Sequence, residues 1–203
     1  MNIAEQIDDA RRRFGAQQRV RGFAIDDTDL GESIAGFPVV CRIRDVSEHA
    51  RDIGAKVIFA LYRPDVMRER VALLATYGLL PEIFTSFVHP HAYLARSASI
   101  GRGTVVFAHA SLMKGVTVGD FCILNSQVII EHDARVGSSC FLAAGACLGA
   151  DVALGHGVFV GMEAVLRPGI AVGDFAFVNM GAVVTRDVER GEQVRQDGSR
   201  RAH

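Results

Sequence analysis

The hydrophobic residues of this chain follow different patterns in its two halves. From Val88 to Val184 an aliphatic residue stands at every sixth position without a break, and a small or β-branched residue follows four positions after nearly all of them. A period of six is neither the 3.6 of an α-helix nor the 2 of a plain strand. It fits a short strand followed by a corner, with one large and one small side chain pointing inward on each face.

A longer period inside the repeat predicts a coil with three sides. Glycines recur at intervals of three hexapeptides, at Gly101, Gly119, Gly137, Gly155 and Gly173. These coil-spaced glycines should share one corner, where we expect a positive φ that glycine adopts at least cost. Asn125 and Asn179 have the equivalent phase on another corner, and asparagine is the next best residue for that conformation. Successive coils should stack about 4.8 Å apart.

The first 86 residues lack this repeat and alternate between helical and strand patterns. We expect helices at Ile3–Phe14 and Val66–Tyr77 and strands at Arg19–Ile25 and Lys56–Leu61. This alternation predicts a small α/β unit. The sequence therefore divides into a small α/β domain at 1–86, a β-dominated domain of hexapeptide repeats at 87–187 and a charged C-terminal tail at 188–203. We expect the tail to be disordered or loosely packed.

Composition and charge argue against several classes of function. A net charge of −1 gives no global field that would attract nucleic acid or an anionic membrane. No apolar run approaches the roughly 18 residues that span a bilayer, and the N-terminus lacks the apolar core of a secretory signal. The four cysteines form no CxxC pair, which favours a reduced, cytoplasmic setting. We interpret Cys122, Cys140 and Cys147 as small core residues.

His132 stands out among the histidines by its context. It follows the inward-facing Ile130 by two positions, so its side chain should leave the core and reach the surface of the prism, and Asp133 comes directly after it. A neutral imidazole accepts a proton at cytoplasmic pH, and a neighbouring carboxylate holds its tautomer and favours the imidazolium. The alternative reading of such a pair is a solvated corner without function.

The repeat resembles that of the hexapeptide-repeat acyltransferases, whose prism is a left-handed parallel β-helix. With GFAIDD (Gly22–Asp27), AGFPVV (Ala35–Val40) and KVIFAL (Lys56–Leu61) before it, the chain resembles the bacterial sugar acetyltransferases. That family includes sialic acid O-acetyltransferase and the N-acetyltransferases of UDP-linked 4-amino sugars. The resemblance implies a Rossmann-like N-terminal domain, shortened here because the sequence starts inside the region of the family's first helix.

The segment LNSQVIIEHDARVG (Leu124–Gly137) resembles the site motif of this family. The resemblance implies that His132 is the general base and that Asp133 raises its basicity. It also implies that the backbone N–H of Gly149, one coil further on, holds the oxyanion.

The same resemblance implies residues for the two substrates. Phe141, Met162 and Met180 fall where relatives line the acetyl-CoA channel, and Asp26 and Asp27 fall where relatives contact the nucleotide of the sugar donor. The alternative for Phe141 and the two methionines is ordinary apolar packing at a subunit seam. Family members are homotrimers with their sites between subunits.

The resemblance therefore implies an acetyl-CoA-dependent enzyme that acetylates a sugar in surface polysaccharide or glycan biosynthesis, without a metal. N-acetylation of a nucleotide-linked amino sugar is preferred over O-acetylation of sialic acid or a capsule sugar, and another acyl donor stays open. A non-catalytic trimeric scaffold is a further alternative. A γ-class carbonic anhydrase would use the positions of His91, Gln127 and His132, but zinc prefers imidazole, thiolate or carboxylate to a neutral amide.

Overall fold

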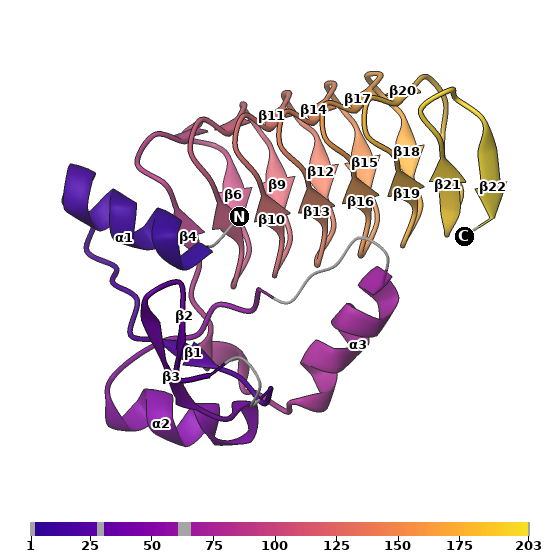
Figure 1. The fold of residues 1–203 in the computed structure, drawn as a ribbon. Coiled ribbons are helices and arrows are strands. Elements are labelled where there is room, and N and C mark those ends of the chain that lie inside the picture. The colour runs from indigo at the N-terminus through magenta and orange to yellow at the C-terminus, as the bar shows by residue number, and fades with distance from the viewer. Residues whose placement is uncertain (1–2, 28–30, 61–65, 203) are drawn as a thin grey trace.

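In a computed structural model of the chain, which describes residues 3–27, 31–60 and 66–202, the repeat forms a three-sided prism of stacked coils (Figure 1). Each turn of the coil contributes one two-residue strand to each of three parallel sheets. Strands of successive coils pair in register, so that each residue meets its counterpart three hexapeptides later, as in Ile123 with Phe141 and Ile129 with Cys147. The three sheets are named after their first strands: the β4 face, the β5 face and the β6 face.

The β4 face contains β4 (Phe87–Val88), β7 (Val105–Val106), β10 (Ile123–Leu124), β13 (Phe141–Leu142), β16 (Phe159–Val160) and β19 (Phe177–Val178). The β5 face contains β5 (Tyr93–Leu94), β8 (Ser111–Leu112), β11 (Ile129–Ile130), β14 (Cys147–Leu148), β17 (Val165–Leu166) and β20 (Val183–Val184). The β6 face contains β6 (Ser99–Ile100), β9 (Thr117–Val118), β12 (Arg135–Val136), β15 (Ala153–Leu154) and β18 (Ala171–Val172).

The interior of the prism is filled by the two residues of each hexapeptide that the sequence pattern predicted to point inward. The second residue of nearly every strand points inward, and Leu112, Ile130 and Leu148 are completely buried. The small residue four positions later, such as Ala134 or Ala146, is completely buried at the corner. Burying one large aliphatic side chain contributes about 1.5–3 kcal/mol, so the predicted inward pattern supplies the core of the fold.

The corners show where the expected positive φ lies, and it is not at the predicted glycines. A left-handed residue recurs at every sixth position from Gly103 to Gly181. Its N–H typically donates a hydrogen bond to a carbonyl of the preceding coil, as Asp133 N–H does to the Lys114 carbonyl. Eight of these residues are not glycine: His109, Phe121, Gln127, Asp133, Ser139, Asp151, Glu163 and Phe175. The expectation that the coil-spaced glycines carry the positive φ is therefore wrong.

Close approach between coils explains the coil-spaced glycines instead. A Cβ on Gly119 would lie 2.7 Å from the Ser138 amide nitrogen, and one on Gly155 would lie 2.7 Å from that of Asp174. The expectation of a positive φ at Asn125 and Asn179 is also wrong. Both act through their side chains, since Asn125 Nδ2 donates to the Leu142 carbonyl at 3.1 Å and Asn179 Nδ2 to the Val194 carbonyl at 3.2 Å.

Within its described residues, the N-terminal region contains a small mixed sheet and three α-helices. Its elements are α1 (Ile3–Phe14), β1 (Phe23–Ala24), β2 (Ser33–Ile34), β3 (Phe37–Cys41), η2 (Ile43–Asp45), α2 (Val46–Asp52), α3 (Met67–Thr76) and η4 (Pro81–Ile83). The sheet order is β1-β3-β2, with β1 parallel and β2 antiparallel to β3. The expected strand at Lys56–Leu61 is reduced to a bridge between Val57 and Phe84, and Leu61 lies outside the described residues.

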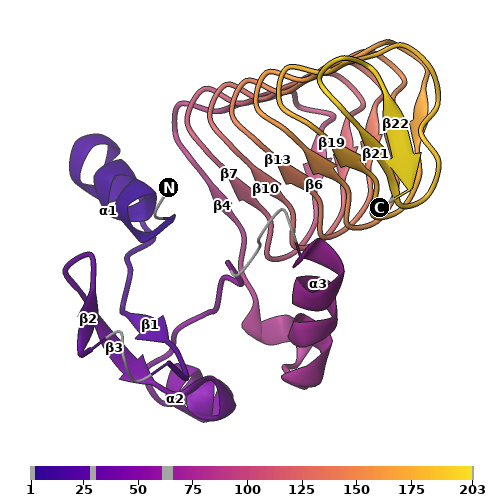
Figure 2. The ribbon, with the colours of Figure 1, turned by 45° about the vertical axis from the view of Figure 1, so that its right-hand side comes forward.

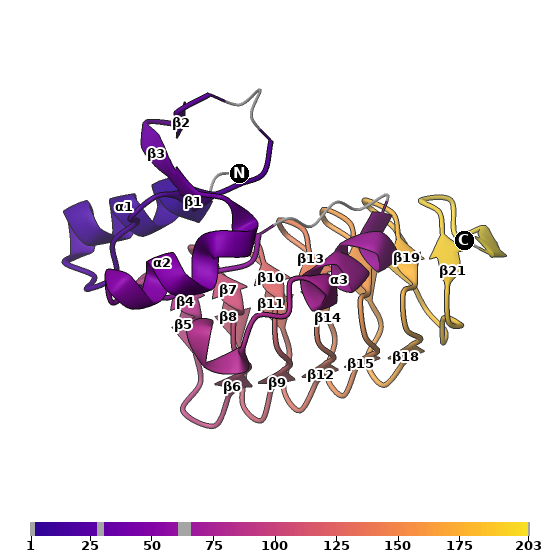
Figure 3. The same cartoon turned by 90° about the horizontal axis from the view of Figure 1, so that it is seen from below.

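This region packs on the outer side of the β4 face (Figure 2). Outward residues of that face form an apolar stripe in which Phe141, Phe159 and Phe177 stack, with ring centroids 5.6 and 4.7 Å apart. Helix α3 begins near β19 and runs back alongside the prism (Figure 3), and its Met67 belongs to the same apolar cluster. The β4 face is therefore covered within one chain.

The C-terminal residues continue and close the prism, although the sequence led us to expect loose packing. Val188 bridges to Val172, β21 (Glu192–Val194) pairs with β19, and β22 (Arg200–Ala202) turns back antiparallel on β21. Arg200 joins this hairpin by an ion pair with Glu192 at 3.3 Å. Among the described residues, no helix is long and apolar enough to cross a membrane.

Candidate active site on the prism

His132 and Asp133 form a hydrogen-bonded pair on the corner between β11 and β12, which we call the β5/β6 corner. His132 Nδ1 lies 3.0 Å from Asp133 Oδ2, and the two side chains are 55% and 52% exposed. The backbone on both sides is fixed, because the His132 carbonyl accepts from the Asp151 N–H at 3.0 Å and Asp133 N–H donates to Lys114. A rigid corner therefore presents this pair to solvent.

The geometry of the pair defines what the imidazole can do. A carboxylate only accepts hydrogen bonds, so the ring nitrogen that faces it carries the hydrogen. This leaves Nε2 as the unprotonated nitrogen of the neutral ring, directed away from Asp133. A histidine oriented by a carboxylate in this way can accept a proton at Nε2, while the carboxylate stabilises the imidazolium that forms.

The Gly149 amide does not have the free hydrogen that the sequence led us to assign to it. Its N–H donates to the Leu166 carbonyl at 2.9 Å within the β5-face ladder. The glycine is required for another reason, because a Cβ here would lie 2.6 Å from the Pro168 nitrogen. The assignment of an oxyanion donor to Gly149 therefore does not fit this structure.

Ala150 is a residue of this corner that the sequence reasoning did not consider. It lies exactly one coil after His132, in the same corner position. No acceptor for its N–H is found among the described residues, and its carbonyl accepts from the Gly169 N–H at 2.8 Å. A spacing of three full hexapeptides from His132, rather than the presence of a glycine, is the signal that would have found it.

The residues assigned to the acetyl-CoA channel lie at two different places on the prism. Phe141 lies on the β4 face, where it stacks on Phe159 within the cluster that holds the N-terminal region. Met162 and Met180 lie one above the other on the corner between the β4 and β5 faces and are 50% and 56% exposed. Neither place is the corner of His132, so one chain does not bring these residues together with the base.

Asp26 and Asp27 follow β1 in the N-terminal region, and both are exposed. Asp26 Oδ1 accepts from the Ile43 N–H at 2.9 Å, which ties the end of β1 to the start of η2. Because this region covers the β4 face, and the β5/β6 corner lies opposite that face in a three-sided coil, the two aspartates and His132 of one chain lie on opposite sides of the prism.

The known proteins that resemble this chain share its fold. The profile of the hexapeptide repeat of succinyl-transferase matches residues 127–162 and 151–186. The acetyltransferase domain of PglB from Neisseria gonorrhoeae, solved with acetyl coenzyme A, is 26% identical, with 94% of this chain and 88% of that one covered and a TM-score of 0.75. PerB from Caulobacter crescentus, solved with CoA and GDP-perosamine, is 25% identical, with 95% and 89% covered and a TM-score of 0.76.

The chain therefore has the hexapeptide repeat and the fold of these acetyltransferases. The fold class is confirmed as a left-handed parallel β-helix preceded by a small α/β region. WeeI from Acinetobacter baumannii has the same fold, at 22% identity, with 94% and 90% covered and a TM-score of 0.61. Among curated protein sequences, no significant match to the chain was found.

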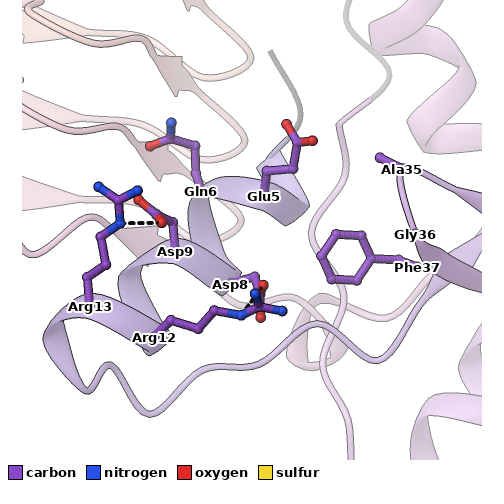
Figure 4. Close-up of a pocket in the computed structure, with 9 residues that line it drawn as sticks. All are labelled: Glu5, Gln6, Asp8, Asp9, Arg12, Arg13, Ala35, Gly36 and Phe37. Carbon is purple, nitrogen blue, oxygen red and sulfur yellow. Dashed lines mark ion pairs between the residues drawn. The ribbon is translucent and has the colours of Figure 1, made fainter.

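Two hollows of the described chain lie at α1, away from His132. One, of about 500 Å³, lies between α1 and the turn that joins β2 to β3 (Figure 4). Phe37 approaches it from the hairpin, and ion pairs of 2.8 and 2.7 Å join Arg12 to Asp8 and Arg13 to Asp9 on the helix. The second hollow adjoins the end of α1 and is lined by arginines that include Arg11 and Arg19.

The carbonic anhydrase alternative has no geometric support in one chain. His91 lies on the corner between the β4 and β5 faces, packed against Phe14 and His109 with ring centroids 4.3 and 5.3 Å away. His132 lies on a different corner. In the part of the chain that the structure describes, no group of three or more His, Cys, Asp or Glu side chains is arranged to hold a metal.

Proposed function

We propose that the protein transfers the acetyl group of acetyl-CoA to an amino group of a nucleotide-linked sugar, with His132 as the general base. The observation that carries this proposal is the His132–Asp133 pair, held at 3.0 Å on an exposed corner of the prism. The prism itself is shared with PglB, solved with acetyl coenzyme A, and with PerB, described as a GDP-perosamine N-acetyltransferase and solved with CoA and GDP-perosamine.

The residues present account for each proton in such a transfer. The sugar amine attacks the thioester carbonyl, so that an N–C bond forms while the C–S bond breaks. His132 Nε2 takes the proton that the amine loses and returns it to the departing thiolate. Asp133 accepts from Nδ1–H throughout and stabilises the transient imidazolium. No metal is required for these steps.

Ala150 supports the reaction as the oxyanion donor in place of Gly149. Its N–H lacks an acceptor in the described chain and belongs to the coil next to His132, about 4.8 Å along the prism. A backbone N–H fixed by its own ladder is preorganised for the charge that develops on the thioester oxygen. The residue type is unimportant for this role, because only the backbone donates.

Apolar surface on the β5 face supports both a pantetheine channel and a subunit interface. Apart from Val88, the exposed large apolar side chains of the described prism gather on this face and on its corner with the β4 face: Tyr93, Ile129, Met162, Val165, Met180 and Val183. Exposed apolar side chains gathered in this way mark binding surfaces. We assign Met162 and Met180 to the acetyl-CoA arm, while Phe141 is accounted for by its packing with Phe159.

The opposite placement of base and acceptor domain supports a homotrimer with sites between subunits. His132 lies on the β5/β6 corner, whereas Asp26 and Asp27 lie in the region that covers the β4 face of the same chain. A cyclic assembly can bring the β5/β6 corner of one subunit against the N-terminal region of the next. The sugar nucleotide would then reach His132 from a neighbouring chain, with the two aspartates at its nucleotide end.

The test is thiol release from acetyl-CoA against GDP-linked and UDP-linked 4-amino sugars and free sialic acid. Wild type is compared with His132→Asn and with the matched control His156→Asn, which changes a histidine on another corner. We expect turnover on a nucleotide-linked amino sugar, lost by about 10²-fold or more only in His132→Asn. Turnover on sialic acid alone would replace N-acetylation by O-acetylation. Failure of wild type both to turn over and to bind acetyl-CoA would favour the scaffold alternative.

A further inference from the structure

The coil before His132 has a glycine directly beneath the Asp133 carboxylate. Gly115 precedes Asp133 by exactly one coil, and the two share the left-handed conformation, with φ of 73° and 61°. A Cβ on Gly115 would fall on Asp133 Oδ1 and would lie 3.3 Å from its Cγ. The coils are joined at this point by the hydrogen bond from Asp133 N–H to the Lys114 carbonyl at 2.9 Å. The carboxylate therefore occupies space that a side chain at position 115 would take.

Backbone conformation alone does not explain why position 115 is a glycine. The same left-handed turn holds eight non-glycine residues elsewhere in the prism, including Asp151 with a φ of 58° in the same corner row. The fold thus tolerates a side chain in this conformation. As at Gly103, Gly145 and Gly157, a side chain of the next coil lies over the glycine, and over Gly115 that side chain is the Asp133 carboxylate.

We propose that Gly115 is a positioning residue for the acetyl transfer. This proposal rests on the function proposed above for His132. The empty space over its Cα lets Oδ1 of Asp133 lie against the preceding coil, while Oδ2 stays 3.0 Å from His132 Nδ1. Both oxygens belong to one rigid carboxylate, so moving Oδ1 rotates Oδ2 away from the ring. Without that acceptor, the Nδ1–H tautomer loses its partner and Nε2 is no longer kept free for the acceptor's proton.

The chain contains a matched control for this proposal. Gly169 lies in the same corner row as Gly115, three coils further on, with a φ of 78°. A Cβ on Gly169 would meet nothing within 4 Å. Gly115→Ala and Gly169→Ala therefore place the same methyl group in the same backbone conformation on the same row, and only the first reaches a carboxylate.

The experiment measures the His132 tautomer and the turnover of both variants. Ring ¹⁵N shifts of His132 at alkaline pH, recorded without substrates, report the fraction of the Nδ1–H tautomer. We expect that fraction to fall in Gly115→Ala and to stay at the wild-type value in Gly169→Ala. We also expect kcat to fall by about 10- to 100-fold in Gly115→Ala, with the KM for acetyl-CoA unchanged. In an Asp133→Ala background, Gly115→Ala should cost nothing further.

Equal tautomer fractions in the two glycine variants would overturn the proposal, as would an additional loss of kcat in the Asp133→Ala background. If Gly115→Ala alone fails to fold, the double variant with Asp133→Gly removes the clash, and its recovery of the fold supports the contact. The tautomer fraction of His132 is measured in the free protein, without substrates. If this fraction falls in Gly115→Ala while wild type shows no turnover, the positioning role of Gly115 stands and the proposed acetyl transfer is wrong.

Discussion

Gly149 lies directly beneath Pro168 of the next coil, and a Cβ at position 149 would lie 2.6 Å from the proline nitrogen and 2.7 Å from its Cδ. The proline ring is rigid and its coil is fixed by neighbouring ladder bonds, such as the one from Gly169 N–H to the Ala150 carbonyl at 2.8 Å. Neither partner can move without breaking the stacking of two coils, so this glycine is a requirement of the fold.

Gly149→Ala should therefore destabilise the protein by about 1–3 kcal/mol, the usual effect of forcing atoms into a packed interior. Gly149 does not have a positive φ, so strain from the left-handed conformation does not contribute. The free energy of unfolding in urea measures the effect. Pro168→Ala combined with Gly149→Ala should recover part of the loss, and a double variant no more stable than Gly149→Ala would contradict the contact.

The two cysteines inside the prism should not react with thiol reagents in the native state. Cys122 and Cys140 are completely buried, and the Cys140 N–H donates to Cys122 Sγ at 3.4 Å. Burial, followed by the neighbouring Cys122 thiol, raises the pKa of Cys140 well above its ordinary range, and only the thiolate is nucleophilic. Mass spectrometry after brief alkylation should find both unmodified, and both modified in denaturant. Rapid native labelling of Cys140 would show that the coils open locally.

Stability should fall as the pH drops below about 6.5, because of His89. Burial, followed by the nearby His91 and His109, lowers the pKa of His89, and Asp9 of α1 opposes this. Its Nδ1 accepts from the His91 N–H at 3.1 Å, which a protonated ring cannot do. A group whose pKa is lower in the folded than in the unfolded state binds its proton more readily when the chain is unfolded. Its contribution to stability is therefore present above the unfolded pKa and is lost as the pH falls below it. Unfolding free energies measured from pH 7.5 to 5 should fall less steeply in His89→Gln than in wild type.

Phe159→Ala should loosen the N-terminal region from the prism. Phe159 is 8% exposed and stacks on both Phe141 and Phe177, beneath the cluster that includes Met67 of α3. Truncating a buried phenylalanine costs about 3–5 kcal/mol. Hydrogen exchange should then increase in α3 while the ladders of the β5 and β6 faces stay protected. Met180→Ala, an exposed change, is the control, and equal exchange in both variants would contradict this docking.

Two inactive variants should restore activity when they are mixed, if the site lies between subunits. One is His132→Ala, which lacks the base, and the other is the double variant Asp26→Ala with Asp27→Ala, which lacks the proposed nucleotide contacts. After denaturation and joint refolding, some interfaces combine an intact corner with an intact N-terminal region, and these should turn over substrate. An inactive mixture that is fully assembled would place the site within one chain.

Much of the candidate site could be predicted from the sequence, since period and motif place His132 and Asp133 on one exposed corner. The resemblance assigned the oxyanion donor to Gly149, whereas we propose Ala150. The hydrogen-bond ladder is the reason: the Gly149 N–H is used by the Leu166 carbonyl, whereas the Ala150 N–H has no acceptor in the described chain. A donor of that kind belongs to the backbone and leaves no trace in residue identity.

The sequence by itself determined the prism, its coil length and its inward-facing residues. The reason is that each hexapeptide repeats the same strand and corner, and each inward position must be apolar. Only the tertiary structure decided why the coil-spaced glycines are there, since the atoms that exclude a Cβ come from the next coil. It also decided that the C-terminal residues close the prism and that the N-terminal region covers the β4 face, opposite His132. These contacts join segments far apart along the chain, and a local pattern does not encode which distant surfaces meet.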